Sequence, residues 1–148
     1  MLLAGVAVSA FLIYGVNQTW VWDGLNHESW ATGIHLSTMG DNQGLHAGSK
    51  VEMGAALVLV GVVIACLYVF HRHPVALLVA AGLFAAGGLL ARSGVGDART
   101  EMGYYSGLTE TAWMDRTTNS ATFLFGLAAV IALTGCALLA VRVRHSDP

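Results

Sequence analysis

Residues that could bind a metal ion gather in one polar stretch of the chain, residues 17–50. Its histidines are His27, His35 and His46, and its acids include Asp23, Glu28 and Asp41. Imidazole and carboxylate ligands suit zinc, and the methionines at positions 39, 53, 102 and 114 would suit copper. However, the histidines are eight and eleven positions apart, and this stretch contains no HxH or HxxxH pattern. A copper or zinc site is therefore an alternative to ordinary interfacial polar residues.

Other reactive side chains point to no catalytic site. The chain has no GxSxG or HExxH motif, and we interpret GYYSG at residues 103–107 as a turn. Cys66 and Cys136 form no CxxC motif and lie in apolar runs, so we expect two free packing thiols, with a pair that can oxidise as the alternative. The apolar runs hold no histidine that could bind haem. We predict neither an enzyme nor a cofactor.

The composition places these residues in a membrane protein. The chain is 55% hydrophobic and 11% charged, with a mean hydropathy of +0.64. Soluble domains have about 25% charged residues. The formal net charge of −2 and the lack of a basic arm argue against a nucleic-acid partner. The lipid bilayer is thus the first partner that we expect.

The apolar runs predict one all-α domain, a four-transmembrane-helix bundle. The predicted spans cover residues 1–20, 51–70, 75–91 and 120–141 approximately. An outer loop covers 21–50, a short inner turn 71–74, a second outer loop 92–119 and an inner tail 142–148. The first run lacks the basic start of a signal peptide, so we expect a retained span. Pro74 separates the second and third spans.

The basic residues predict the orientation. Arg72, Arg142 and Arg144 are concentrated in the short turn and the tail, whereas the four basic residues of the long loops are diluted among acids. The positive-inside rule then places both termini in the cytoplasm and both long loops outside. Abundant glycine and alanine with a single lysine indicate a GC-rich bacterium. We therefore expect a multi-pass protein of the bacterial inner membrane.

Aromatic residues gather in the two outer loops. They are Trp20, Trp22, Trp30, Tyr104, Tyr105 and Trp113. Tryptophan and tyrosine are enriched both at lipid headgroups and in protein interfaces. Trp20 and Trp22 fit a headgroup belt, whereas the other four fit an ordered cap or an interface. Loops of this length are usually either functional or disordered, and the aromatics and modest charge argue against disorder. We therefore expect short helices in them, over Glu28–Leu36 and Thr109–Arg116.

Small residues recur at four-residue spacing in the third span, where helices can pack closely. The pairs are Ala81/Ala85 and Gly82/Ala86, followed by Gly87 and Gly88. The spans hold no ionisable residue away from their ends, which disfavours a pump or transporter. Glu52 and Arg92 at the outer boundary either pair with each other or face water.

The function that fits these features is a non-catalytic accessory subunit of a larger bacterial membrane complex, either respiratory or involved in envelope lipid transport. The predicted docking residues are Trp30, Tyr104, Tyr105, Trp113, Gly82 and Ala86. Two alternatives stay open. One is a metal-handling protein that uses the outer histidines, and the other is a lipid-binding protein with a cavity under the cap.

Overall fold

Helices dominate the fold. The computed structural model describes residues 1–34, 47–103 and 107–145. Its helices are α1 (Leu2–Val16), α2 (Ala47–His71), α3 (Val75–Met102) and α4 (Ala112–Arg144). Three of these described helices, α2 to α4, are long and apolar enough to cross a membrane. At 15 residues, α1 is shorter than the roughly 20 residues of a typical span. The structure thus agrees with a helical membrane protein.

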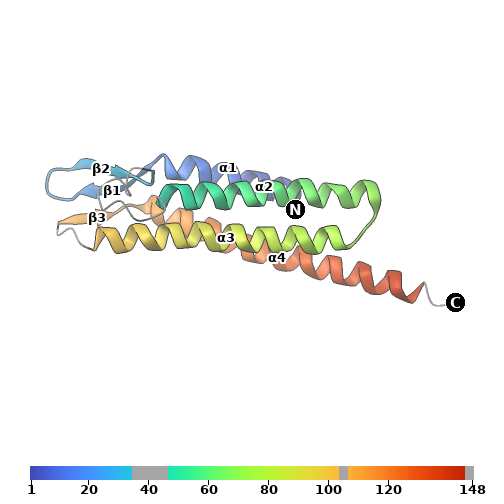
Figure 1. The fold of residues 1–148 in the computed structure, drawn as a ribbon. Coiled ribbons are helices and arrows are strands. Elements are labelled where there is room, and N and C mark those ends of the chain that lie inside the picture. Colours follow the sequence, from blue (N-terminus) through green and yellow to red (C-terminus); the bar gives the residue numbers. More distant parts are fainter. Residues whose placement is uncertain (35–46, 104–106, 146–148) are drawn as a thin grey trace.

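The four helices form a bundle with a ring of neighbours. α1 packs on α2 and α4, and α3 packs on the same two helices, so α2 and α4 lie on a diagonal (Figure 1). The α2–α3 turn and the end of α4 lie at one end of the bundle, and a small sheet lies at the other. We call these the turn end and the sheet end.

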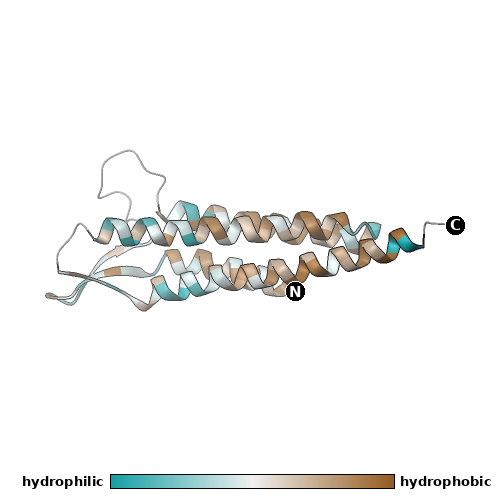
Figure 2. Cartoon of the chain, turned by 90° about the horizontal axis from the view of Figure 1, so that it is seen from below, coloured by the Kyte–Doolittle hydropathy of each residue, from teal (hydrophilic) through white to brown (hydrophobic). Residues whose placement is uncertain are grey.

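Both α3 and α4 extend well beyond the predicted spans. The third span was predicted to end at residue 91, yet α3 continues to Met102, and α4 begins at Ala112 rather than at Ser120. Their 28 and 33 residues correspond to about 42 and 50 Å, against about 30 Å of hydrocarbon. Figure 2 shows hydrophilic residues on these helices near the sheet end. Most of the predicted second loop is therefore polar helix.

A sheet replaces the helices predicted in the outer loops. Its strands are β1 (Thr19–Asp23), β2 (Glu28–Thr32) and β3 (Leu108–Glu110), antiparallel in the order β2-β1-β3. The helix of the first predicted span therefore ends at Val16 and not near residue 20, and the helix expected over Glu28–Leu36 is wrong where β2 lies. The segment Thr109–Arg116 is divided between β3 and α4. Threonine, valine and tryptophan in β1 favour extended backbone, and the Asp23–Gly24 pair favours the turn.

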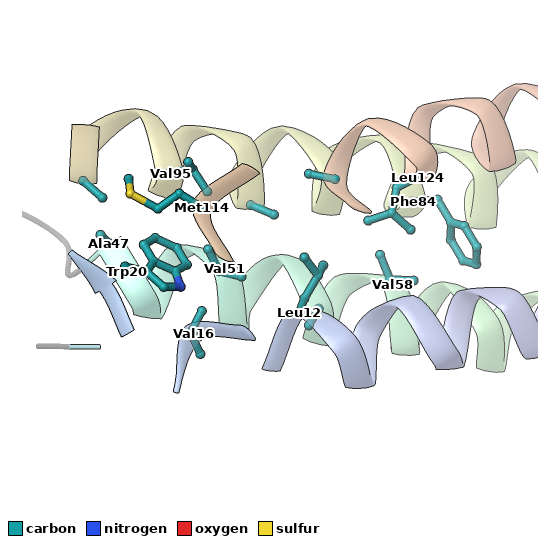
Figure 3. Packing of buried hydrophobic residues seen from close by; sticks show 14 of the residues in the cluster. Leu12, Val16, Trp20, Ala47, Val51, Val58, Phe84, Val95, Met114 and Leu124 are labelled. Atoms are coloured by element: carbon teal, nitrogen blue, oxygen red, sulfur yellow. The ribbon is translucent and has the colours of Figure 1, made fainter. Parts of the chain in front are cut away.

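Glycines bring α2 and α3 into backbone contact. A methyl group on Gly87 would lie 2.5 Å from the Gly54 carbonyl oxygen, too close for any side chain. Gly88 faces α4, where a methyl group would lie 2.9 Å from the carbonyl oxygen of Ala121. Around these contacts Val58, Phe84 and Leu124 fill the core (Figure 3). The predicted close packing through small residues of this helix is confirmed at Gly87 and Gly88.

Candidate functional site

Trp20 forms the centre of the sheet end. Its side chain is 0% exposed, and its Nε1 donates a hydrogen bond to the Gly15 carbonyl oxygen at 2.8 Å. A methyl group on Gly33 would lie 2.6 Å from the indole ring, so the backbone after β2 lies directly on it. The prediction that Trp20 belongs to a headgroup belt is wrong. After β2 the chain returns to the end of α1, where the Ile34 N–H donates a hydrogen bond to the Val16 carbonyl oxygen at 3.3 Å. This returning segment covers the ring.

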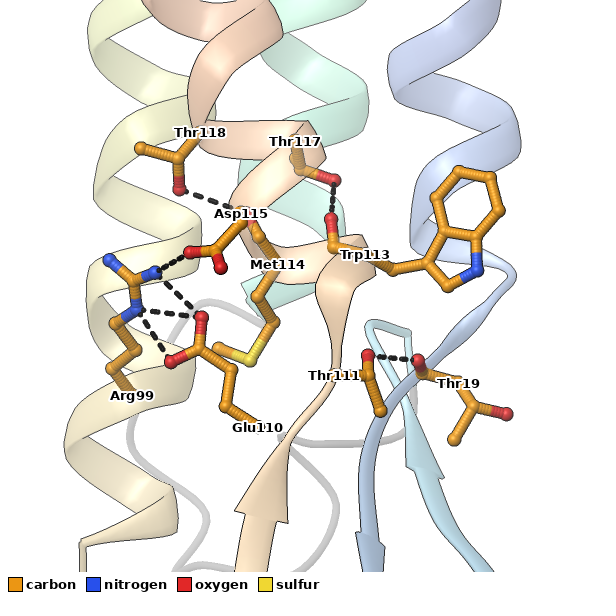
Figure 4. A network of polar contacts seen from close by, with 9 residues as sticks. All are labelled: Thr19, Arg99, Glu110, Thr111, Trp113, Met114, Asp115, Thr117 and Thr118. Atoms are coloured by element: carbon orange, nitrogen blue, oxygen red, sulfur yellow. Dashed lines mark hydrogen bonds and ion pairs between the residues drawn. The ribbon is translucent and has the colours of Figure 1, made fainter.

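A charged network joins three elements around the sheet. The Arg99 guanidinium on α3 donates to both carboxylate oxygens of Glu110 on β3, at 2.6 to 3.1 Å, and to Asp115 on α4 at 2.8 Å (Figure 4). A separate ion pair, Lys50 to Asp97 at 2.5 Å, joins α2 to α3. Charged side chains of α2, α3, β3 and α4 therefore join these four elements at the sheet end.

Threonine hydroxyl and backbone groups fasten α4 to β1. The Thr111 Oγ1 donates to the Thr19 carbonyl oxygen at 2.5 Å, and the Thr111 N–H donates to the Trp20 carbonyl oxygen at 3.0 Å. These bonds lie where β3 leads into α4 (Figure 4). No local sequence pattern predicts this network, because its partners are 11 to 92 positions apart in the chain.

The predicted interface aromatics are tied into the bundle where the structure describes them. Trp113 is half-buried and its ring lies 5.6 Å from Tyr14 and 5.9 Å from Phe11, both on α1. The Arg116 guanidinium lies over the same ring, 4.9 Å from the ring centre. Trp30 is half-buried against the core. Tyr104 and Tyr105 lie outside the described residues. Trp113 thus connects α1 to α4.

Of the three predicted histidines, the structure describes His27. His27 is exposed at the β1–β2 turn with a positive φ of 58°, and its ring lies 5.4 Å from that of Trp22. His35 and His46 lie outside the described residues. Within residues 1–34, 47–103 and 107–145, no three histidine, cysteine or acidic side chains come together as metal ligands. Met114, one of the possible copper ligands, is fully buried in the core.

The acid at the start of the β1–β2 turn, Asp23, is already hydrogen-bonded. Asp23 accepts hydrogen bonds from the Leu25 N–H at 2.8 Å and from the Asn26 side chain at 2.8 Å. The backbone hydrogen bond from Leu25 is the main reason that the pKa of Asp23 lies below its ordinary value. The carboxylate therefore holds the turn.

Two faces of α3 have different roles. Gly87 and Gly88 face the core, whereas a methyl group on Gly82 would meet nothing within 4 Å. Ala86, four residues further on, is half-buried. Of the predicted docking residues in the spans, Gly82 thus lies on the outward face of the bundle. Glu52 and Arg92 are also exposed, in agreement with the water-facing alternative.

The two cysteines are free thiols, as expected. Cys66 is half-buried on α2, and Cys136 is exposed on α4. The expectation that both are packing residues is wrong for Cys136, whose side of α4 faces outward.

With this geometry in view, comparison with known proteins found no matching family model, no matching curated protein and no matching solved structure. The arrangement of this chain has to be interpreted from its own residues.

Proposed function

We propose that this chain is a non-catalytic structural subunit of a larger bacterial membrane assembly, either a respiratory complex or an envelope lipid-transport machine. In this proposal all four helices lie in the inner membrane. We assign that turn end and both termini to the cytoplasmic side, and the arginines of the turn end support this assignment. The sheet end then lies outside the membrane.

The observation that carries the proposal is the bare outward backbone at Gly82. Lipid tails pack equally well on any apolar side chain, whereas a bare glycine lets the backbone of another helix approach closely. The same helix uses Gly87 in this way inside the bundle, with α2 as the partner. On the adjacent helix α4, Gly126 is equally open, with nothing within 4 Å of an added methyl group. Two neighbouring helices thus present surfaces suited to a partner helix.

The sheet end supports the same proposal. Leu25 at the tip of the β1–β2 turn is 83% exposed, although the strands behind it are firmly attached to the bundle. A large apolar side chain on a well-fixed turn can bind a partner with little loss of conformational entropy. This tip would contact the outer part of the same assembly.

Gentle extraction of tagged protein at native expression, with identification of co-purifying proteins, tests the proposal. We expect stoichiometric membrane partners with the wild type and their loss with Gly82→Leu. The matched control is Ala56→Leu, which adds bulk to an exposed position of α2. Recovery of the bait alone would overturn the subunit function. Retention of the partner by Gly82→Leu would exclude the α3 face as the docking surface.

A further inference from the structure

Two adjoining cavities lie at the turn end of the bundle, between α2 and α4. The first has a volume of about 510 Å³, and its polar lining comes from Arg72, Arg142 and His145. The second, of about 130 Å³, is apolar and is lined by residues such as Ala65, Leu77 and Ile131. Tyr68 lines both cavities, so they meet at its side chain. One basic chamber therefore opens beside one apolar chamber.

The basic chamber is strongly cationic for its size. Residues 68–77 and 131–148 contain three arginines, three histidines and one acid, Asp147, which lies outside the described residues. Arg142 is held across the α2–α3 turn, with its Nη1 3.4 Å from the Arg72 carbonyl oxygen and 3.2 Å from the His73 Nδ1. Arg72 itself has a φ of 54°, a conformation that favours glycine. Arg72 ends α2 as a left-handed cap, with its N–H bonded to the Tyr68 carbonyl oxygen at 2.8 Å.

The apolar chamber continues from the basic one toward the middle of the spans. It is bounded by α2, α3 and α4, and the first residues of α1, Met1 and Leu2, line its other side. Val69 and Phe70 beside it are 59% and 78% exposed. Figure 2 shows hydrophobic residues along this part of the bundle and hydrophilic residues at the end of α4. The lining thus changes from basic in the first cavity to apolar in the second, in the same order as the headgroup and acyl chains of a phospholipid.

We propose that these chambers bind one anionic phospholipid. Its phosphate lies against Arg72 and Arg142, because a guanidinium pairs with a phosphate through charge-assisted hydrogen bonds. One acyl chain passes Tyr68 into the apolar chamber, and the tyrosine has an apolar body and a polar tip suited to that junction. Basic pockets between membrane helices are suited to acidic headgroups. The proposal is independent of any protein partner.

Lipid binding to purified, delipidated protein tests this inference. Native mass spectrometry with dioleoyl phosphatidylglycerol and dioleoyl phosphatidylcholine compares two headgroups on identical chains. We expect the wild type to bind the anionic lipid about tenfold more tightly, since each arginine near an anionic group contributes to affinity. Arg72→Gln/Arg142→Gln should reduce the preference to about twofold or less. Arg92→Gln, an exposed arginine toward the sheet end of α3, is the matched control and should keep the full preference.

Two further measurements distinguish the contribution of the apolar chamber from that of the basic chamber. Thr134→Phe fills the apolar chamber from α4 and should lower the affinity for both lipids severalfold. The preference for the anionic headgroup should stay the same. Inorganic phosphate should bind far more weakly than the lipid, and phosphate binding as tight as lipid binding would overturn the assignment. Equal affinity for the two lipids would also overturn it, as would an unchanged preference in the double variant. If that variant unfolds, Arg72→Gln alone keeps the Arg142 bridge and should still lower the preference measurably.

Discussion

The two ends of the bundle are built in opposite ways. At the sheet end, Trp20 is enclosed by returning chain, and ion pairs and threonine hydrogen bonds join α2, α3, α4 and the strands. At the turn end, the bridges from Arg142 to Arg72 and His73 join α4 to the α2–α3 turn beside open cavities. The same helices thus end in a closed, cross-linked structure on one side and an open, cationic one on the other.

The difference between the two ends shows where a helical bundle of this kind accommodates non-helical backbone. Within hydrocarbon every peptide group must be satisfied internally, so irregular structure is costly there. Because α3 and α4 extend beyond the apolar zone, the strands form where water and polar side chains can satisfy them (Figure 2). The helix extensions therefore carry the sheet to the hydrophilic end of the bundle.

The largest effect should come from Trp20→Ala. Removing a fully buried indole and its hydrogen bond to Gly15 should lower the free energy of unfolding by about 3–5 kcal/mol. The measurement is unfolding in mixed micelles, followed by circular dichroism. Trp22→Ala removes a half-buried ring on the same strand and should cost about 1 kcal/mol or less. Equal losses from both variants would contradict a sheet end centred on Trp20.

Gly87→Ala should follow in size. The methyl group would meet the Gly54 carbonyl oxygen at 2.5 Å and force α2 and α3 apart, at a cost of about 2–3 kcal/mol. Gly82→Ala, five residues away on the open face, should change stability by less than about 1 kcal/mol and in the favourable direction. Thermal melting in detergent compares the two variants. A larger loss from Gly82→Ala would reverse our assignment of the inward and outward faces of α3.

Arg99→Gln should have a modest effect. It removes the bonds to Glu110 and Asp115, but the arginine side chain is 40% exposed, so we expect a loss of about 1 kcal/mol or less. The loss should shrink as salt is raised, because ions screen exposed pairs. Melting temperatures of wild type and variant at low and high sodium chloride measure this dependence. A loss of several kcal/mol would show that the network, and not Trp20, dominates the sheet end.

Asp23→Ala should have the smallest effect, and that effect should depend on pH. The pKa of Asp23 is lowered in the folded protein, mainly by the Leu25 hydrogen bond. Its stabilisation is therefore present above the unfolded pKa of about 3.9 and is lost as pH falls through the lowered folded value. The melting-temperature difference between wild type and variant should be constant from pH 5 to 7 and disappear in acid. A difference that persists in acid would assign it to the turn backbone instead.

Hydropathy alone predicted much of the helical scaffold. The end of α2 near His71 and the start of α3 after Pro74 agree with the sequence, because apolar runs and proline act locally. The polar extensions of α3 and α4 were missed, since hydropathy cannot distinguish a polar helix from a loop. β3 has three residues, and Glu110 pairs with Val21 far away in the chain, so no local pattern could reveal the sheet.

For the candidate sites too, the sequence identified several of the residues but not their arrangement in space. Arg72 and Arg142 were recognised as orientation signals, but their cavity depends on how α2 and α4 lie across the bundle. Gly82 was recognised by its spacing, yet spacing could not distinguish its outward face from the inward face of Gly87. Trp20 was misassigned because a tryptophan after an apolar run has the same pattern whether it meets lipid headgroups or is covered by the following strand.

The pairing of β1 with β3 has a consequence for the order in which this protein assembles. Residues 21 and 110 are partners, and the chain between them contains both α2 and α3. Closing so long a loop is entropically costly and slow. We therefore expect β1 and β3 to pair after the α2–α3 hairpin has formed and has brought the two strands to the same end of the bundle. In this order of folding the sheet forms late, and its formation would report that α2 and α3 have already paired.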